Sequence, residues 1–142
     1  EKIMFKMFKS KNFKPKKSYD SLFLNRDNLL EIKKLGHLIG LHSHSHPMIM
    51  EKLTYTEQKQ EYQKNINILS KVLDCDKKEL KYMAHPSGSY NNNTLQILTN
   101  FGIELGFKQI MTVEYEKSMQ KINNSFLEVA RQDQADIMKM IR

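Results

Sequence analysis

The sequence lacks the features that mark several common classes of protein. Its only cysteine is Cys75, so no disulfide can form within the chain and a thiolate-rich structural zinc site is excluded. No apolar run approaches the ~20 residues needed to span a bilayer, which predicts a soluble protein without an integral membrane segment. Internal repeats are absent, and the only low-complexity stretch is three asparagines at 91–93. With 142 residues, 39% of them hydrophobic, we expect a single domain over residues 1–142.

The beginning of the chain lacks both a methionine and a signal-peptide pattern. The missing signal pattern favours the cytoplasm, but a start at Glu1 suggests a piece of something longer. The compartment therefore stays open, as does the oligomeric state.

Charge is unevenly distributed along the sequence. The net charge is +7, from 23 Lys and Arg against 16 Asp and Glu, and much of the excess lies in the first seventeen residues. Phe5, Phe8 and Phe13 are interleaved with the lysines there, so a nucleic-acid or membrane-surface patch is one interpretation. We favour a solvated stretch anchored by its phenylalanines, with no nucleic-acid partner, because blocks of like charge usually face water.

Hydrophobic spacing and turn residues predict short strands alternating with helices, with a loop around Pro15. The expected helices are 28–35, about 54–73, 94–101 and 135–141, and the expected strand-type segments are 38–41, 80–84, 105–111 and 126–130. Thr54 and Glu57 form a capping box, while Gly36 and Gly102 are placed to end helices. This pattern is typical of an α/β fold with a largely parallel sheet, whose chemistry gathers at the carboxyl ends of the strands.

Three of the five histidines, His42, His44 and His46, fall within five residues directly after the apolar segment 38–41. Imidazole is the commonest protein ligand for zinc, so the cluster predicts a metal site. A helical turn or tight loop would pair His42 with His46. An extended segment would instead point all three rings to one face. Spacing alone leaves the role of His44 open, and hydrogen-bonded surface histidines are the bland alternative.

The segment Gly36-His37-Leu38-Ile39-Gly40 followed by His42-Ser43-His44-Ser45-His46-Pro47 resembles the second motif of the polysaccharide deacetylase family (NodB-homology domain, carbohydrate esterase family 4). The segment Ala84-His85-Pro86-Ser87-Gly88 is similar to the family's Arg-x-Pro-x-Gly motif. The likeness spans about residues 24–107, with a fainter echo at 129–133.

This resemblance implies a partial distorted (β/α) barrel in which the opening strand is absent. It assigns His42 and His46 as ligands of a divalent metal, most often zinc, and sets His44 aside. It also implies that the Ser87 N–H helps to hold an oxyanion, and that Pro86 and Gly88 shape the substrate groove. His85 either faces that groove or faces solvent.

Departures from the family pattern are equally informative. The resemblance leads us to expect an Asp-Asp pair that supplies the general base and a third metal ligand, and the chain has none. Asp20 and Asp27 stand in the wrong sequence context. Ala84 replaces the usual arginine, Arg131 is a candidate substitute, and no late histidine follows His85. Either the first strand lies outside this chain, which we favour, or the chain is a degenerate member.

The expected function is therefore metal-dependent hydrolysis of N-acetyl groups on a bacterial polysaccharide or its lipid-linked precursor. The alternative is a non-catalytic carbohydrate-binding or metal-binding relative of the deacetylases. The sugar, the choice between N- and O-deacetylation and the native metal are not specified by the sequence.

Overall fold

A computed structural model describes residues 2–109, 125–131 and 137–138 of the chain. Contacts divide the chain into two compact units, Glu1–His37 and Leu38–Arg142, whereas the sequence leads us to expect one domain over residues 1–142. The assignment of both units to a single domain stays a prediction. Within the described residues, no helix has the length and apolar character needed to cross a membrane.

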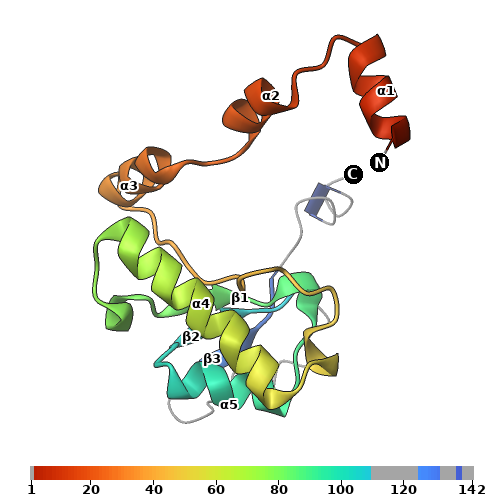
Figure 1. Cartoon of the computed structure of the whole chain (residues 1–142). Helices are drawn as coiled ribbons and strands as arrows, with labels where there is room; N and C mark the ends of the chain where they lie inside the picture. The colour runs from red at the N-terminus through yellow and green to blue at the C-terminus, as the bar shows by residue number, and fades with distance from the viewer. Residues whose placement is uncertain (1, 110–124, 132–136, 139–142) are drawn as a thin grey trace. The chain divides into compact units, whose positions relative to one another are not determined.

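The N-terminal unit contains three helices, α1 (Lys2–Ser10), α2 (Pro15–Leu22) and α3 (Arg26–Lys34), drawn in red and orange in Figure 1. The prediction of a loop around Pro15 is wrong at that residue, because Pro15 lies in the first turn of α2. Proline fits there because its missing N–H has no partner in a helix start anyway. Helix α3 confirms the expected helix, with Asn25 as its N-cap and Gly36 at φ +88° beyond its end.

In the lysine-rich first seventeen residues, 2–10 form α1, a turn follows, and the last three residues belong to α2. The ring of Phe8 packs against those of Phe5 and Phe13, with centroids 6.5 and 4.9 Å apart. Phe5 nevertheless remains 65% exposed. Aromatic contacts within the segment therefore account for only part of its apolar surface.

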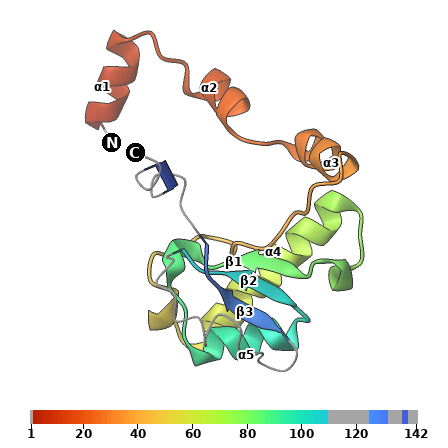
Figure 2. The same cartoon turned by 180° about the vertical axis from the view of Figure 1, so that it is seen from behind.

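The second unit is built on a parallel sheet in the order β1-β2-β3. Its strands are β1 (Tyr82–Ala84), β2 (Leu105–Phe107) and β3 (Phe126–Val129). Helices α4 (Tyr55–Leu73) and α5 (Asn92–Asn100) pack together on one side of the sheet, as the two opposite views show (Figure 1 and Figure 2). The described part of the unit also has three short 3₁₀ turns: η1 (Met50–Lys52), η2 (Lys77–Glu79) and η3 (Pro86–Gly88). These findings confirm the predicted α/β class and parallel sheet.

Local sequence signals account for most of these elements. Thr54 and Glu57 cap α4 reciprocally, as predicted, and Asn91 with Thr94 forms the same arrangement at α5. Strand β2 is shorter than the expected 105–111, since Lys108 and Gln109 lie beyond its end, and residues 110 and 111 lie outside the described part. Of the helix expected at 135–141, only Ile137 and Met138 are described, and both are helical.

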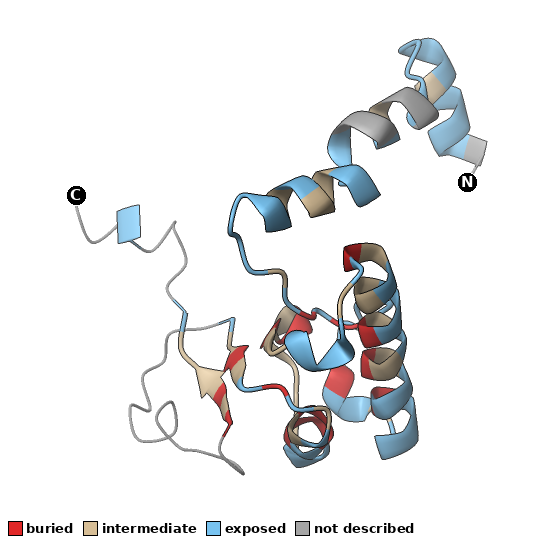
Figure 3. Cartoon of the chain, turned by 90° about the vertical axis from the view of Figure 1, so that its left-hand side faces the viewer, coloured by how far each residue is buried: buried red, intermediate tan, exposed pale blue. Residues whose placement is uncertain are grey.

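The core lies between the sheet and its two helices, where the buried residues are drawn red in Figure 3. Met83 and Leu127 from the sheet, Tyr62 from α4 and Leu98 from α5 are all at most 2% exposed. Gln58 of α4 accepts a hydrogen bond from the Thr94 hydroxyl at 2.5 Å, which joins the two helices through a satisfied polar pair.

The apolar segment 38–41 is not a full strand, contrary to the sequence-based expectation. Only Leu41 pairs with β1, through a parallel bridge to Met83. The Leu41 N–H donates to the Tyr82 carbonyl at 2.8 Å, and the Ala84 N–H donates to the Leu41 carbonyl at 3.0 Å. A Cβ on Gly40 would lie 2.9 Å from the Tyr82 carbonyl oxygen, so glycine is what lets the segment approach.

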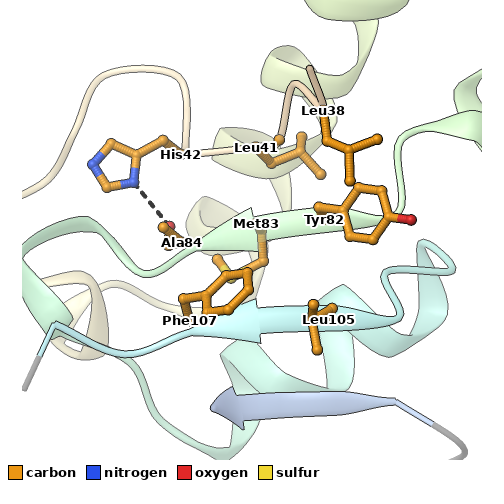
Figure 4. Close-up of a pocket in the computed structure, with 9 residues that line it drawn as sticks. Leu38, Leu41, His42, Tyr82, Met83, Ala84, Leu105 and Phe107 are labelled. Carbon is orange, nitrogen blue, oxygen red and sulfur yellow. Dashed lines mark hydrogen bonds between the residues drawn. The ribbon is translucent and has the colours of Figure 1, made fainter. Parts of the chain in front are cut away.

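The other face of the sheet is partly open. Paired residues of neighbouring parallel strands point to the same face of a sheet. This face therefore carries two such pairs, Tyr82 with Leu105 and Ala84 with Phe107, and all four residues are half-buried. With Leu38, Leu41 and His42 they line a mainly apolar pocket of about 330 Å³ (Figure 4).

His85 lies immediately after β1 and is only 3% exposed. This burial contradicts the solvent-facing alternative. Its ring Nε2 lies 2.8 Å from the Leu127 carbonyl oxygen, and because a carbonyl only accepts, Nε2 carries the proton. Nδ1 has no hydrogen-bond partner among the described residues. Burial is the main reason that the pKa of His85 falls to about 4, against the smaller opposing effect of the Leu127 hydrogen bond.

The contact at Gly40 predicts that Gly40→Ala lowers the free energy of unfolding by about 1–3 kcal/mol, because the added methyl meets backbone that cannot move aside. Urea denaturation measures the loss. Gly36→Ala is the matched control: it is strained by its φ of +88° but has no neighbour within 4 Å. We expect amide NMR signals of His42 and Ala84 to shift in Gly40→Ala only. Unshifted signals there would contradict the proposed close packing.

Burial of neutral His85 predicts a pH-dependent stability. The folded-state pKa of about 4 lies below the unfolded value of 6.5, so the unfolded chain binds the proton first as the pH falls. The contribution is fully present above pH 6.5 and decreases toward pH 4, by about 3 kcal/mol in total. Denaturant midpoints across this range should fall more steeply for the unmodified chain than for His85→Phe. Parallel curves would refute the assignment.

Candidate metal centre

The loop 42–47 begins directly after Leu41, the residue that pairs with β1, at the carboxyl end of the sheet. The ring Nδ1 of His42 lies 2.9 Å from the Ala84 carbonyl oxygen, the hydrogen bond drawn dashed in Figure 4. Because the carbonyl is an acceptor, Nδ1 carries the proton and Nε2 keeps its lone pair. A histidine that donates one ring N–H to a backbone carbonyl is oriented to offer the other nitrogen to a metal.

His46 lies beside His42. The two ring centroids are 4.9 Å apart and the ring planes meet at 61°. The backbone between them is neither helical nor extended, since Ser43 and His46 both have left-handed φ values, 64° and 53°. The His46 N–H donates to the Ser43 hydroxyl at 3.1 Å. Of the two geometries that the spacing allows, the structure has the tight loop, which pairs His42 with His46.

His44 is exposed, and no described ring contact joins it to the other two histidines. Its backbone N–H instead donates to Glu61. The exclusion of His44 from the metal ligands stays a prediction. Among the described contacts, its ring has none with His42 or His46.

Helix α4 holds the loop in place. Glu61 accepts hydrogen bonds from the N–H of His44 at 3.1 Å and from the N–H and hydroxyl of Ser45 at 2.7 and 2.9 Å. One turn later, Asn65 accepts the His42 N–H at 3.0 Å. Burial opposes ionisation of Glu61, but the bonds from Ser45 and His44 outweigh it and lower the pKa of the carboxyl. Sequence reasoning missed Glu61 and Asn65, because polar residues four positions apart recur along this helix and their spacing does not single them out.

The turn 86–88 follows the same strand that supports His42. Pro86 is buried, and Ser87 has a left-handed φ of 53°. Its hydroxyl lies 3.7 Å from the Met48 sulfur. No hydrogen bond among the described residues uses the Ser87 N–H, so that donor is available. At Gly88, with φ +66°, a Cβ would lie 3.0 Å from the Gln109 Cβ.

Four other residues that the sequence singles out are Asp20, Asp27, Arg131 and Ala84. Asp20 and Asp27 belong to the N-terminal unit. Arg131 is exposed just beyond β3, and its orienting role stays a prediction. Ala84 contributes its carbonyl oxygen instead of a side chain. Within the described residues, no three His, Cys, Asp or Glu side chains come together as a metal site.

The donor set suits zinc in kind but is incomplete. Two neighbouring imidazoles are ligands of the type that zinc prefers, and the hydrogen bond to Ala84 leaves Nε2 of His42 unprotonated. A catalytic zinc normally takes three protein ligands. The described residues therefore offer His42 and His46 as candidate ligands, and their role in metal binding stays a prediction.

Comparisons with known proteins bear on the family and the fold. The family model for polysaccharide deacetylase matches residues 7–106. No curated protein matches the chain. The deacetylase PplD of Streptococcus pyogenes, solved in complex with acetate, is 26% identical, with a TM-score of 0.61 over 76% of this chain.

Two more distant structures share the fold. The BpsB deacetylase domain of Bordetella bronchiseptica is 13% identical, with a TM-score of 0.59 over 78% of this chain. BA3943 of Bacillus anthracis, described as a CE4 family pseudoenzyme, is 19% identical, with a TM-score of 0.53 over 82% of this chain.

The chain spans only part of each structure: 43% of PplD, 48% of the BpsB domain and 44% of BA3943. The small parallel sheet with helices on one side is consistent with part of a NodB-type barrel, as the resemblance implies. Because the family model covers most of the chain, including the histidine loop and the turn 86–88, this protein belongs to the polysaccharide deacetylase family.

Proposed function

We propose that the whole protein is a metal-dependent deacetylase that hydrolyses N-acetyl groups on a bacterial polysaccharide or its lipid-linked precursor. The observation that carries this proposal is the hydrogen bond from His42 to the Ala84 carbonyl. It frees one imidazole nitrogen for a metal, and it does so on the strand that leads into the turn with the available Ser87 N–H. Membership of the family supports the reaction class.

His42 and His46 would hold the metal together with a third ligand, because no third His, Cys, Asp or Glu joins them among the described residues. A bound zinc-class ion would supply Lewis acidity toward an amide carbonyl and an activated water. The Ser87 N–H would donate to the oxyanion that develops from that carbonyl. Pro86 and Gly88 fix the left-handed backbone that presents the donor.

The pocket beside His42 indicates how a substrate would be oriented. Its walls are mainly apolar, with Leu38, Tyr82 and Phe107 among them (Figure 4). An apolar lining with few polar groups suits the methyl of an acetyl group and the face of a sugar ring better than a charged chain. We expect the open sheet face to be covered in part by the rest of the protein.

A second candidate is a non-catalytic carbohydrate-binding or metal-binding relative. The specific observation in its favour is that, among the described residues, no third His, Cys, Asp or Glu joins the two histidines as a possible metal site. BA3943, which shares the fold, is itself described as a pseudoenzyme. An Asp-Asp pair on an apolar strand encoded upstream of Glu1 would support the enzyme, and its absence would support the binding protein.

Metal analysis tests the site directly. We expect the purified chain to bind about one zinc-class ion at neutral pH and to lose it in the double variant His42→Ala, His46→Ala. His44→Ala is the matched control, because its ring has no described contact with the pair, and it should keep the metal. Absence of bound zinc in the unmodified chain, measured with excess Zn²⁺, would count against the site.

Acetate release tests the reaction in the whole protein. With an N-acetylated oligosaccharide as substrate, Gly88→Val should lower kcat by about 10²-fold, because strain and the contact with Gln109 would move the oxyanion donor. Ser87→Gly is the control: it keeps the N–H and favours the left-handed backbone, so its activity should stay within about threefold. Equal activity of both variants would remove the turn from the mechanism. Oligosaccharide binding without any acetate release would favour the second candidate.

A further inference from the structure

The end of β1 supports both parts of the proposed site. The Nδ1–H of His42 donates a hydrogen bond to the Ala84 carbonyl, with 2.9 Å between nitrogen and oxygen. The turn 86–88, which follows, carries the available N–H of Ser87. His85 is the residue that connects Ala84 to this turn. Its own conformation therefore affects the orientation of a metal ligand on one side and of a backbone donor on the other.

Contacts on every side hold His85. Its N–H donates to the Phe107 carbonyl of β2 at 2.9 Å, and its carbonyl accepts the Gly88 N–H at 3.1 Å. The ring donates from Nε2 to the Leu127 carbonyl of β3 at 2.8 Å. The opposite support is Tyr90, whose ring stacks on the imidazole with centroids 4.1 Å apart and planes at 22°. One residue thus joins the end of β1 to both other strands.

The bond to β3 is not replaceable by ordinary strand pairing. Within the described three-stranded sheet, β2 lies between β1 and β3, so no ladder hydrogen bond of these strands connects β1 to β3. The imidazole spans that gap through a buried contact where water does not compete. Tyr90 reaches the same strand from its own ring, since its hydroxyl donates to Glu128 at 2.7 Å.

We propose that His85 is a positioning residue, whose ring anchors the end of β1 to β3 and thereby orients His42 for metal binding and Ser87 for oxyanion binding. This inference rests on the proposed function. The sequence leads us to expect His85 in the substrate groove, and that expectation stays a prediction; at 3% exposure, the residue presents little surface to a sugar. Outer-shell partners of this kind typically change metal affinity by about 10- to 100-fold when removed.

The ring of His42 reports on this positioning without any metal. In the unmodified chain above pH 7.5, long-range ¹H–¹⁵N NMR should show the Nδ1–H tautomer of His42, as the bond to Ala84 requires. His85→Phe keeps an aromatic ring against Tyr90 but cannot donate to Leu127. We expect His42 in that variant to become a mixture of tautomers with a fast-exchanging Nδ1 proton. His85→Gln, whose amide can still donate, should restore part of the original signal.

Two further variants separate positioning from general stability. Leu98→Ala destabilises the core from α5 without touching the site, and it should leave the His42 tautomer unchanged. Tyr90→Leu removes the stacked ring but leaves the Leu127 bond, so it should speed exchange of the His42 Nδ1 proton. It also provides the test if His85→Phe does not fold. Unchanged His42 signals in every folded variant of His85 and Tyr90 would overturn the inference.

Zinc titration of the same variants distinguishes this inference from the proposed function. We expect His85→Phe to weaken Zn²⁺ binding by about tenfold and His85→Gln to weaken it less. If the unmodified chain bound no zinc while its His42 tautomer still depended on His85, the proposed function would fail and the positioning role would stand. If zinc bound equally to all variants, the positioning role would fail alone.

Discussion

The site depends on the close approach of Leu41 to strand β1. Two backbone hydrogen bonds hold Leu41 against Tyr82 and Ala84, and Gly40 provides the clearance that they need. His42 follows directly, so its ring reaches the Ala84 carbonyl without a long connecting segment. Because the strand that accepts this hydrogen bond also leads into the turn 86–88, a single pairing sets the position of both halves of the site.

Short-range signals made much of the fold predictable from the sequence. The capping pair Thr54 and Glu57, and the glycines at 36 and 102, act within a few residues of where they stand. The proximity of His42 and His46 was one of the two arrangements predicted from their spacing, because residues four apart in a tight loop bring their rings together. Pro15 shows the limit of such signals: a proline fits a loop and a helix start equally well, and neighbouring residues did not decide between them.

What the sequence did not reveal depends on contacts between distant residues. Glu61 and Asn65 support the histidine loop from about twenty residues away, and nothing local marks them as different from other polar helix residues. The burial of His85 follows from the placement of β3, more than forty residues later. Segment 38–41 has the composition of a buried strand, yet only Leu41 pairs. In its parallel register Leu38 and Ile39 would lie beside residues 80 and 81, and β1 begins only at Tyr82.

Among the described residues, five non-glycine positions have a positive φ, and three of them, Ser43, His46 and Ser87, lie at the candidate site. Left-handed backbone is costly for branched side chains and tolerable for small or polar ones. The choice of residue at Ser43 and Ser87 is therefore restricted by backbone shape before any chemistry is considered. In a library of random substitutions, glycine and asparagine should be recovered there more often than valine or isoleucine. A preference for particular residues at Ser43 and Ser87 would then reflect in part which side chains tolerate the left-handed backbone, and not only selection for catalysis.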